Sequence, residues 1–338
     1  MTNAVRATLR AVTRGPVLGL LIGLAIATAV ILISRPALIW EGIQEVDLAP
    51  LIAALLLNVP IVLLRSVRAQ VALRFLGHRI SLRSMIPVQL VGQTSSTVTP
   101  AASGDYVRAY IWRRNESIPV RDGAAVVTFE RFYSLFLLVL VAILLISLPR
   151  HGWIGWIAVA AGLGVATVSP AGVELVTPPA LERWALRRIT GGRLLGRFAE
   201  GALEMADNLR RLLRSPLILV QTSAITIAVF IFSGLQVMLL LAGLGDSVRI
   251  SQAVSVYATS QVAGILSTLP FGLGAADAIL VAALAGYGVS VADSATAAVL
   301  FRAVSTLPLA LAGLVAYMRI GRPVATEQAA AEAESEAE

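Results

Sequence analysis

Residues 97–108 read TVTPAASGDYVR, and residues 267–278 repeat the pattern as STLPFGLGAADA. Pro100 aligns with Pro270 and Gly104 with Gly274. Each segment interrupts an apolar stretch with Pro, which ends a helix, and with Gly, which permits a sharp reversal of the chain. Paired Gly/Pro-interrupted apolar segments in two halves of a chain are typical of the substrate site of a membrane transporter. The repeat therefore predicts a translocator.

The repeat continues into the helix that follows each break. Residues 118–134 read IPVRDGAAVVTFERFYS, and residues 289–305 read VSVADSATAAVLFRAVS, which aligns Arg131 with Arg302. Each copy has a break, an apolar stretch, an acidic turn and a long apolar helix with one Arg. We define repeat 1 as about residues 85–148 and repeat 2 as about residues 251–318.

The composition indicates an all-α polytopic membrane protein. Of the 338 residues, 57% are hydrophobic and 14% are charged. The apolar runs are continuous and approach the roughly 20 residues of a spanning helix, whereas a β-barrel needs alternating strands of about ten. The chain has no Lys and no Cys, which excludes a Walker A lysine and a thiolate metal site. We expect no enzyme activity, no cofactor, no metal and no nucleic-acid partner.

The order of the apolar stretches predicts about six full spans and two re-entrant helical hairpins. Most arginines, including Arg65 and Arg68, fall on cytoplasmic segments when both termini are cytoplasmic. That orientation holds only if each broken region returns to the side it entered from. An odd number of spans between the repeats then gives an inverted-topology repeat. The expected spans are 16–34, 48–65, 123–148, 153–170, 216–243 and 295–318, and the expected hairpins are 85–112 and 251–289.

The other segments complete a single transmembrane domain over residues 1–322. The first apolar run is longer than the core of a signal peptide, so we expect it to remain in the mature protein. Residues 174–214 are predicted to contain an amphipathic cytoplasmic linker helix, which lies either on anionic lipid or on the protein itself. Residues 323–338 are acidic and Ala-rich, which is typical of a disordered tail.

Charged residues inside the expected spans are candidates for a binding site, because each costs at least about 2.5–3.5 kcal/mol to insert. Arg131 and Arg302 lie at equivalent depths, and a guanidinium binds a phosphate in bidentate fashion. The alternative is that each Arg pairs with a nearby carboxylate, from Glu130, Asp105 or Asp277. Both interpretations hold together if a lipid phosphate displaces the carboxylate.

The breaks contribute the remaining candidates. Their glycines shape the turns, and each following half-helix directs backbone N–H groups at the site centre. The hydroxyls of residues 95–103 either donate to a ligand or satisfy the broken backbone, while a buried Asp could couple transport to protons. The predicted substrate-binding residues are Arg131, Arg302, Arg108, Glu130, Asp105, Asp277, Gly104, Gly272, Gly274, Pro100 and Pro270.

These motifs together resemble a known family. Pro100, Gly104, Asp105 and Arg108, the Glu130-Arg131 pair, the stretch PFGLGAAD at 270–277 and then Arg302 are similar to the transmembrane domain of lysylphosphatidylglycerol synthase/flippase proteins. This is the flippase-like part of the multiple peptide resistance factor and its stand-alone relatives. The similarity covers about residues 10–320. Phe271 in place of Gly, and Asp in place of Glu after each break, depart from the family pattern and weaken transfer of a specific lipid.

The resemblance implies translocation of an anionic phospholipid or a lipid-linked phosphate, such as a polyprenyl phosphate, by flipping or scrambling. The alternatives are ion-coupled transport of a small anionic solute and a non-transporting membrane partner of a lipid glycosyltransferase. The Arg-only, Ala-rich composition is typical of a bacterium, so we expect a multi-pass protein of the bacterial cytoplasmic (inner) membrane. A separate lipid-modifying enzyme and a second copy of the chain are the protein partners left open.

Overall fold

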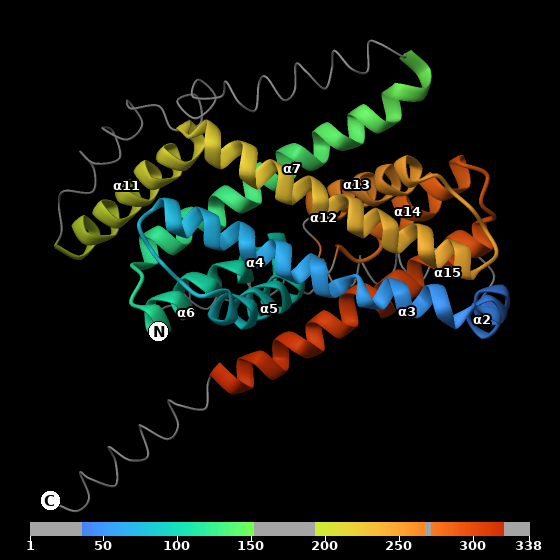
Figure 1. The fold of residues 1–338 in the computed structure, drawn as a ribbon, viewed down its shortest axis with the longest axis horizontal. Helices are drawn as coiled ribbons and strands as arrows, with labels where there is room; N and C mark the ends of the chain where they lie inside the picture. The colour runs from blue at the N-terminus through green and yellow to red at the C-terminus, as the bar shows by residue number, and fades with distance from the viewer. Residues whose placement is uncertain (1–35, 152–192, 268, 270–271, 321–338) are drawn as a thin grey trace, which may run out of the picture.

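The computed structural model describes residues 36–151, 193–267, 269 and 272–320 (Figure 1). Within these ranges the regular structure is helical and contains no strand, which confirms the all-helical class. The expected spans at 16–34 and 153–170, the first part of the linker and the tail at 323–338 lie outside the described residues.

Four helices of the described part are long and apolar enough to cross a membrane, and they coincide with the other four expected spans. One boundary was wrong. The span expected to end at residue 65 continues to Phe75, so Arg65 and Arg68 lie inside it and not on a flanking segment. The two arginines do not end the helix because Arg is a good helix former, and both find polar partners within the bundle. The four helices are Leu48–Phe75, Val120–Leu145, Pro216–Gly243 and Val291–Ile320.

Local sequence sets several helix ends. Asp47 and Ser290 each accept a hydrogen bond from a backbone N–H of the helix that follows, and Ser81 does so from Ser84. The elements are α2 (Pro36–Glu45), α3 (Leu48–Leu56), α4 (Asn58–Phe75), α5 (Leu82–Val98), the 3₁₀ helix Pro100–Tyr106, α6 (Val107–Glu116), α7 (Val120–His151), α11 (Arg193–Arg214), α12 (Pro216–Gly243), α13 (Ile250–Leu266), α14 (Ala275–Gly286), α15 (Val291–Phe301) and a π-helical turn (Arg302–Thr306).

The first break joins α5 to α6 through the 3₁₀ helix, and α5 packs against both. Gly104 is required here because an added Cβ would collide with the backbone carbonyl of Ser95. The Thr99 hydroxyl holds the turn closed: it donates to the Ser95 carbonyl at 2.9 Å and accepts from the Gly104 N–H at 2.6 Å. This hydroxyl satisfies broken backbone, as one of the two interpretations expected.

The second break joins α13 to α14, which pack closely against each other. Gly272 and Gly274 have φ values of 58° and 79°, in the left-handed region that favours glycine. Both predicted breaks are therefore present as interruptions between paired helices. Their return to the side of the membrane from which they start stays a prediction.

Helix α12 lies at the centre of the bundle, where Figure 1 shows it running alongside α3 and α4. It also packs against α7, α13 and α15. The first hairpin meets the helix Val291–Ile320 at Thr94, whose hydroxyl lies 3.3 Å from the Leu309 carbonyl. An added Cβ on Gly313 would collide with the Thr94 hydroxyl and the Leu90 carbonyl, so these two helices touch through a glycine.

Helix α11 packs against α7, which favours contact with the protein over a purely lipid-bound linker. Leu212 is fully buried in the main core. Asn208 donates to Asp122 at 2.8 Å, and Asp122 also lies 2.7 Å from His78 of the α4–α5 connection. Arg121 of α7 forms an ion pair with Glu204 of α11.

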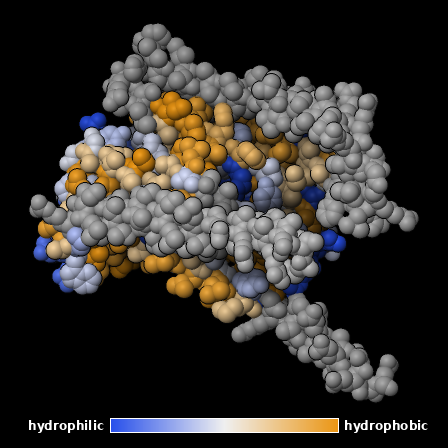
Figure 2. All heavy atoms as spheres, turned by 180° about the vertical axis from the view of Figure 1, so that it is seen from behind, coloured by the Kyte–Doolittle hydropathy of each residue, from blue (hydrophilic) through white to orange (hydrophobic). Residues whose placement is uncertain are grey.

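The exterior is rich in large apolar side chains, while charged groups are buried inside. Trp40, Leu56, Phe132 and Leu311 each expose more than 60% of their surface. Figure 2 shows hydrophobic residues over much of one face, with hydrophilic residues in its middle. An apolar exterior of this extent suits a lipid environment.

Candidate functional site

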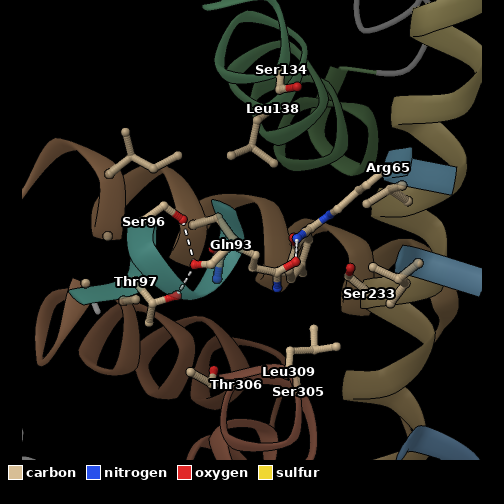
Figure 3. Close-up of a pocket in the computed structure, with 18 of the residues that line it drawn as sticks. Arg65, Gln93, Ser96, Thr97, Ser134, Leu138, Ser233, Ser305, Thr306 and Leu309 are labelled. Carbon is tan, nitrogen blue, oxygen red and sulfur yellow. Dashed lines mark hydrogen bonds between the residues drawn. The ribbon is translucent and has the colours of Figure 1, made fainter. Parts of the chain in front are cut away.

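A cavity of about 380 Å³ lies between the two breaks. Its wall is formed by residues of α4, α5, α7, α12, α13, α14 and the π-helical turn, so both sequence repeats contribute. Much of the lining consists of hydroxyl and amide side chains, among them Ser96, Thr97, Ser134, Ser233 and Thr306, which surround the space in Figure 3. A polar cavity within an apolar helical bundle is the kind of space a polar ligand needs in a membrane.

The cavity is positively charged. Five arginines and three carboxylates line it, which leaves an excess of two positive charges. The arginines are Arg65, Arg68, Arg108, Arg131 and Arg302, and the carboxylates are Asp105, Glu130 and Asp277.

Repeat 1 supplies a continuous network of ion pairs. Arg131 of α7 contacts Asp105 of the first break through Nη2 at 2.9 Å and through Nε at 3.0 Å. Arg108 lies between Asp105, at 2.9 Å, and Glu130, at 2.6 Å. Glu130 also accepts from Arg68 of α4 at 3.0 Å. Arg108 and Glu130 are 1% and 2% exposed, so the two charges compensate each other away from water.

Repeat 2 supplies the corresponding pair. Arg302 contacts Asp277, with Nε 2.7 Å from Oδ1 and Nη2 2.7 Å from Oδ2. Asp277 also accepts from the backbone N–H of Gly274 at 3.0 Å, so the carboxylate caps the helix that follows the break. Arg131 and Arg302 are thus paired with carboxylates, which was one of the two interpretations of their sequence positions.

Arg302 begins a π-helical turn, an irregularity that is frequent at functional sites. Two buried amides support it. Asn58 donates to the Val304 carbonyl at 2.7 Å, and its Oδ1 accepts from Gln236 at 3.2 Å. Gln236 donates in addition to the Ala54 carbonyl at 3.0 Å. This network ties α3, α4 and α12 to the turn that carries Arg302.

Arg65 differs from the other cavity arginines. Its Nη1 donates to Oε1 of Gln93 at 2.9 Å, as Figure 3 shows, but no carboxylate among the described residues forms an ion pair with it. Arg68, one helical turn further along the same face, pairs with Glu130. A charged guanidinium that lines a cavity without a counterion is a candidate anion ligand.

Sequence reasoning missed Arg65, Arg68, Gln93, Asn58 and Gln236. The spacing of the two arginines, three residues apart in an apolar stretch, was the available signal that they share one face of a helix. The amides gave no signal, because their partners lie far away in the sequence.

The predicted residues lie as follows. Arg131, Arg302, Arg108, Glu130, Asp105, Asp277 and Gly272 line the cavity, whereas Gly104 and Gly274 are buried in the breaks. Pro100 begins the 3₁₀ helix. Pro270 lies outside the described residues. Their part in binding stays a prediction.

Comparison with known proteins identifies the family of the chain. Residues 20–313 match the family model described as "Lysylphosphatidylglycerol synthase TM region", which confirms the resemblance. The chain is 25% identical over 322 residues to a "UPF0104 membrane protein" of the archaeon Methanothermobacter thermautotrophicus, covering 90% of this chain and 95% of the relative. It is also 30% identical over 151 residues to "Glycosyltransferase AglD" of Haloferax volcanii, covering 44% of this chain but only 24% of that protein.

Proposed function

Because the chain belongs to the lysylphosphatidylglycerol synthase TM-region family, we propose that its central cavity binds the anionic headgroup of a membrane lipid and carries it across the membrane. The lipid is an anionic phospholipid or a lipid-linked phosphate. The chain acts by flipping or scrambling and catalyses no reaction. It works in the bacterial cytoplasmic membrane with both termini in the cytoplasm.

The observation that carries the proposal is the positive cavity inside an apolar bundle. Arg65 has a hydrogen bond to Gln93 but no carboxylate partner among the described residues, so an entering anion finds an uncompensated charge. Phosphate oxygens accept several hydrogen bonds at once, and the amide and hydroxyl groups of the lining supply further donors.

In the proposed mechanism, the two Arg–Asp pairs exchange a carboxylate for the phosphate of the lipid. A headgroup that reaches Arg131 or Arg302 competes with Asp105 or Asp277 for the same guanidinium. Exchange of a carboxylate for a phosphate keeps the Arg compensated throughout, which lowers the cost of charge in the membrane. The equivalent positions of the two pairs in an inverted repeat would present similar sites to the two leaflets.

The test is lipid translocation in proteoliposomes, with fluorescent phosphatidylglycerol and phosphatidylcholine as probes. Wild type is compared with Arg65→Gln, Arg131→Ala and Arg302→Ala at matched amounts of folded protein. Arg114→Gln, an exposed change on α6, is the control for loss of one positive charge. We expect wild type and the control to move the anionic lipid and the cavity variants to move it at least about tenfold more slowly. Translocation rates equal to those in empty vesicles, with and without a proton gradient, would rule out translocation of these lipids.

A second candidate is a membrane partner for a lipid glycosyltransferase. It is favoured by the similarity to part of a relative named as a glycosyltransferase. In this case the cavity would hold a lipid-linked phosphate for a separate enzyme. Wild type would bind such a lipid without moving it, and an added glycosyltransferase would act faster on lipid presented by the chain than on free lipid.

A further inference from the structure

We propose that the cavity selects a headgroup with two negative charges, a terminal phosphomonoester, over the singly charged phosphodiester of common anionic phospholipids. The inference rests on the proposed function and specifies its substrate class. Arg65 and Gln93 form the position where the phosphate binds.

The charges that line the cavity do not balance. Five arginines face three carboxylates in the cavity, and four of the arginines share those carboxylates through ion pairs of 2.6–3.0 Å. A phosphodiester would neutralise one of the two surplus charges and leave the other in a medium of low dielectric, where an uncompensated charge is costly. A phosphomonoester dianion neutralises both.

The surplus positive charge lies around Arg65. Arg68 lies one helical turn further along the same face of α4, and Arg131 lines the same cavity, while the hydrogen-bond partner of Arg65, Gln93, is neutral. An anion bound beside Arg65 therefore lies in the positive potential of a guanidinium that has no ion-pair partner among the described residues. The favourable electrostatic energy of an anion in that potential grows with its charge, so a dianion is stabilised there more than a monoanion.

Gln93 is a neutral partner of Arg65. Its amide oxygen takes one donor of Arg65 at 2.9 Å but contributes no charge, so the remaining donors and the full positive charge of the guanidinium stay available. Its neighbours Ser96 and Thr97 donate to the Gln93 carbonyl at 2.8 and 2.7 Å, which fixes this part of α5 beside the cavity (Figure 3). Gln93→Glu would place a carboxylate of nearly the same shape against Arg65.

The test measures binding of short-chain phosphatidate, phosphatidylglycerol and phosphatidylcholine to the purified full chain in detergent, at pH 8 and pH 5. Phosphatidate should bind wild type at least about tenfold more tightly than phosphatidylglycerol at pH 8. The preference should fall below about threefold at pH 5, because the phosphomonoester dianion takes up one proton near pH 6 and becomes a monoanion while Arg remains charged. Inorganic phosphate is titrated as a competitor, to separate a lipid headgroup from a free phosphate.

Two variants test the position. Gln93→Glu should abolish the preference at pH 8, because the new carboxylate supplies the missing counterion. Arg114→Gln, an exposed change outside the cavity that also alters the net charge by one, should keep the preference. If Gln93→Glu is poorly folded, the pH series on wild type decides alone.

The outcomes separate the two proposals. Equal affinity of wild type for phosphatidate and phosphatidylglycerol at pH 8, or an unchanged preference in well-folded Gln93→Glu, overturns the inference and leaves lipid binding in place. If inorganic phosphate competes as strongly as phosphatidate, the selection of a phosphomonoester is supported and the assignment of the ligand as a lipid is overturned. Absence of binding by every probe overturns both.

Discussion

Two nitrogens of the Arg302 guanidinium donate to the two carboxylate oxygens of Asp277, each at 2.7 Å. Arg131 meets Asp105 through the same two nitrogens, at 3.0 and 2.9 Å. In both repeats the acid follows the break and the Arg lies in the next long helix. The repeat visible in the sequence is therefore also a repeat of ion pairs. The first copy also extends into a network with the buried Arg108.

Asp277→Asn should destabilise the protein by about 1–3 kcal/mol, because it removes the carboxylate that pairs with the half-buried Arg302. Thermal and denaturant unfolding in detergent measure the change. Asp207→Asn, which breaks an exposed ion pair on α11, is the control and should stay within about 0.5 kcal/mol of wild type. The double variant Asp277→Asn/Arg302→Gln should recover much of the loss. Equal effects of Asp277→Asn and Asp207→Asn would contradict a structural role for the Arg302–Asp277 pair.

Gly104→Ala should cost about 2–3 kcal/mol in the free energy of unfolding, because the new Cβ meets the Ser95 carbonyl, which is backbone and cannot rotate away. Gly201→Ala is the matched control on α11, where nothing lies within 4 Å of the added carbon. It should be neutral or stabilise by up to about 1 kcal/mol, since Ala favours a helix over Gly. Tolerance of Gly104→Ala would show that the first break can relax.

Gln236→Leu should lower stability by about 1–3 kcal/mol, because it leaves the buried Ala54 carbonyl and the Asn58 side-chain oxygen without a donor. Lipid translocation should fall as well, since the network supports the turn that carries Arg302. Gln221→Leu, on the same helix but exposed, should change neither property. A loss of stability with unchanged translocation would separate the network from the site.

The stability of the α12–α13 connection should depend on pH through Asp246. Burial, and then the charge of Asp293, raise the pKa of the Asp246 carboxyl, whose Oδ2 is buried without a hydrogen bond from the described residues. The folded chain therefore holds this proton more tightly than the unfolded chain. The contribution is stabilising below the unfolded pKa of about 4 and is lost as the pH rises through the folded pKa.

Asp246→Asn keeps the neutral form at every pH, so its Tm should exceed that of wild type more at pH 7 than at pH 4. Glu116→Gln, an exposed change at the end of α6, controls for the loss of one negative charge. A gain that is larger at pH 4 than at pH 7 would contradict the raised pKa.

The sequence predicted the parts of the fold that depend on local pattern. Continuous apolar runs predicted four long helices, and Pro100 and Gly274 marked breaks that the structure contains. Arg131 and Arg302 were recognisable because a charge in an apolar helix needs a compensating group. The same reasoning named Asp105 and Asp277 as alternative partners, and the structure contains both pairs.

The remaining features depend on contacts between distant segments. Arg65 and Arg68 looked like the flank of a span, because average hydropathy falls at an Arg whether its guanidinium reaches water or a polar cavity. The structure distinguishes the two cases, since Arg68 contacts Glu130, Ser134 and Thr226 on two other helices. Direction in the membrane and re-entry of the hairpins stay predictions, because they depend on where the bilayer lies.

The contact between Thr94 and the helix Val291–Ile320 links the two repeats mechanically. Gly313 brings that helix into van der Waals contact with α5, and the Thr94 hydroxyl adds a polar link to the Leu309 carbonyl. The hairpin of one repeat is thereby coupled to the helix of the other that carries Arg302. We therefore expect a displacement of α5 to displace the helix that carries Arg302 as well, so that the two walls of the cavity move together.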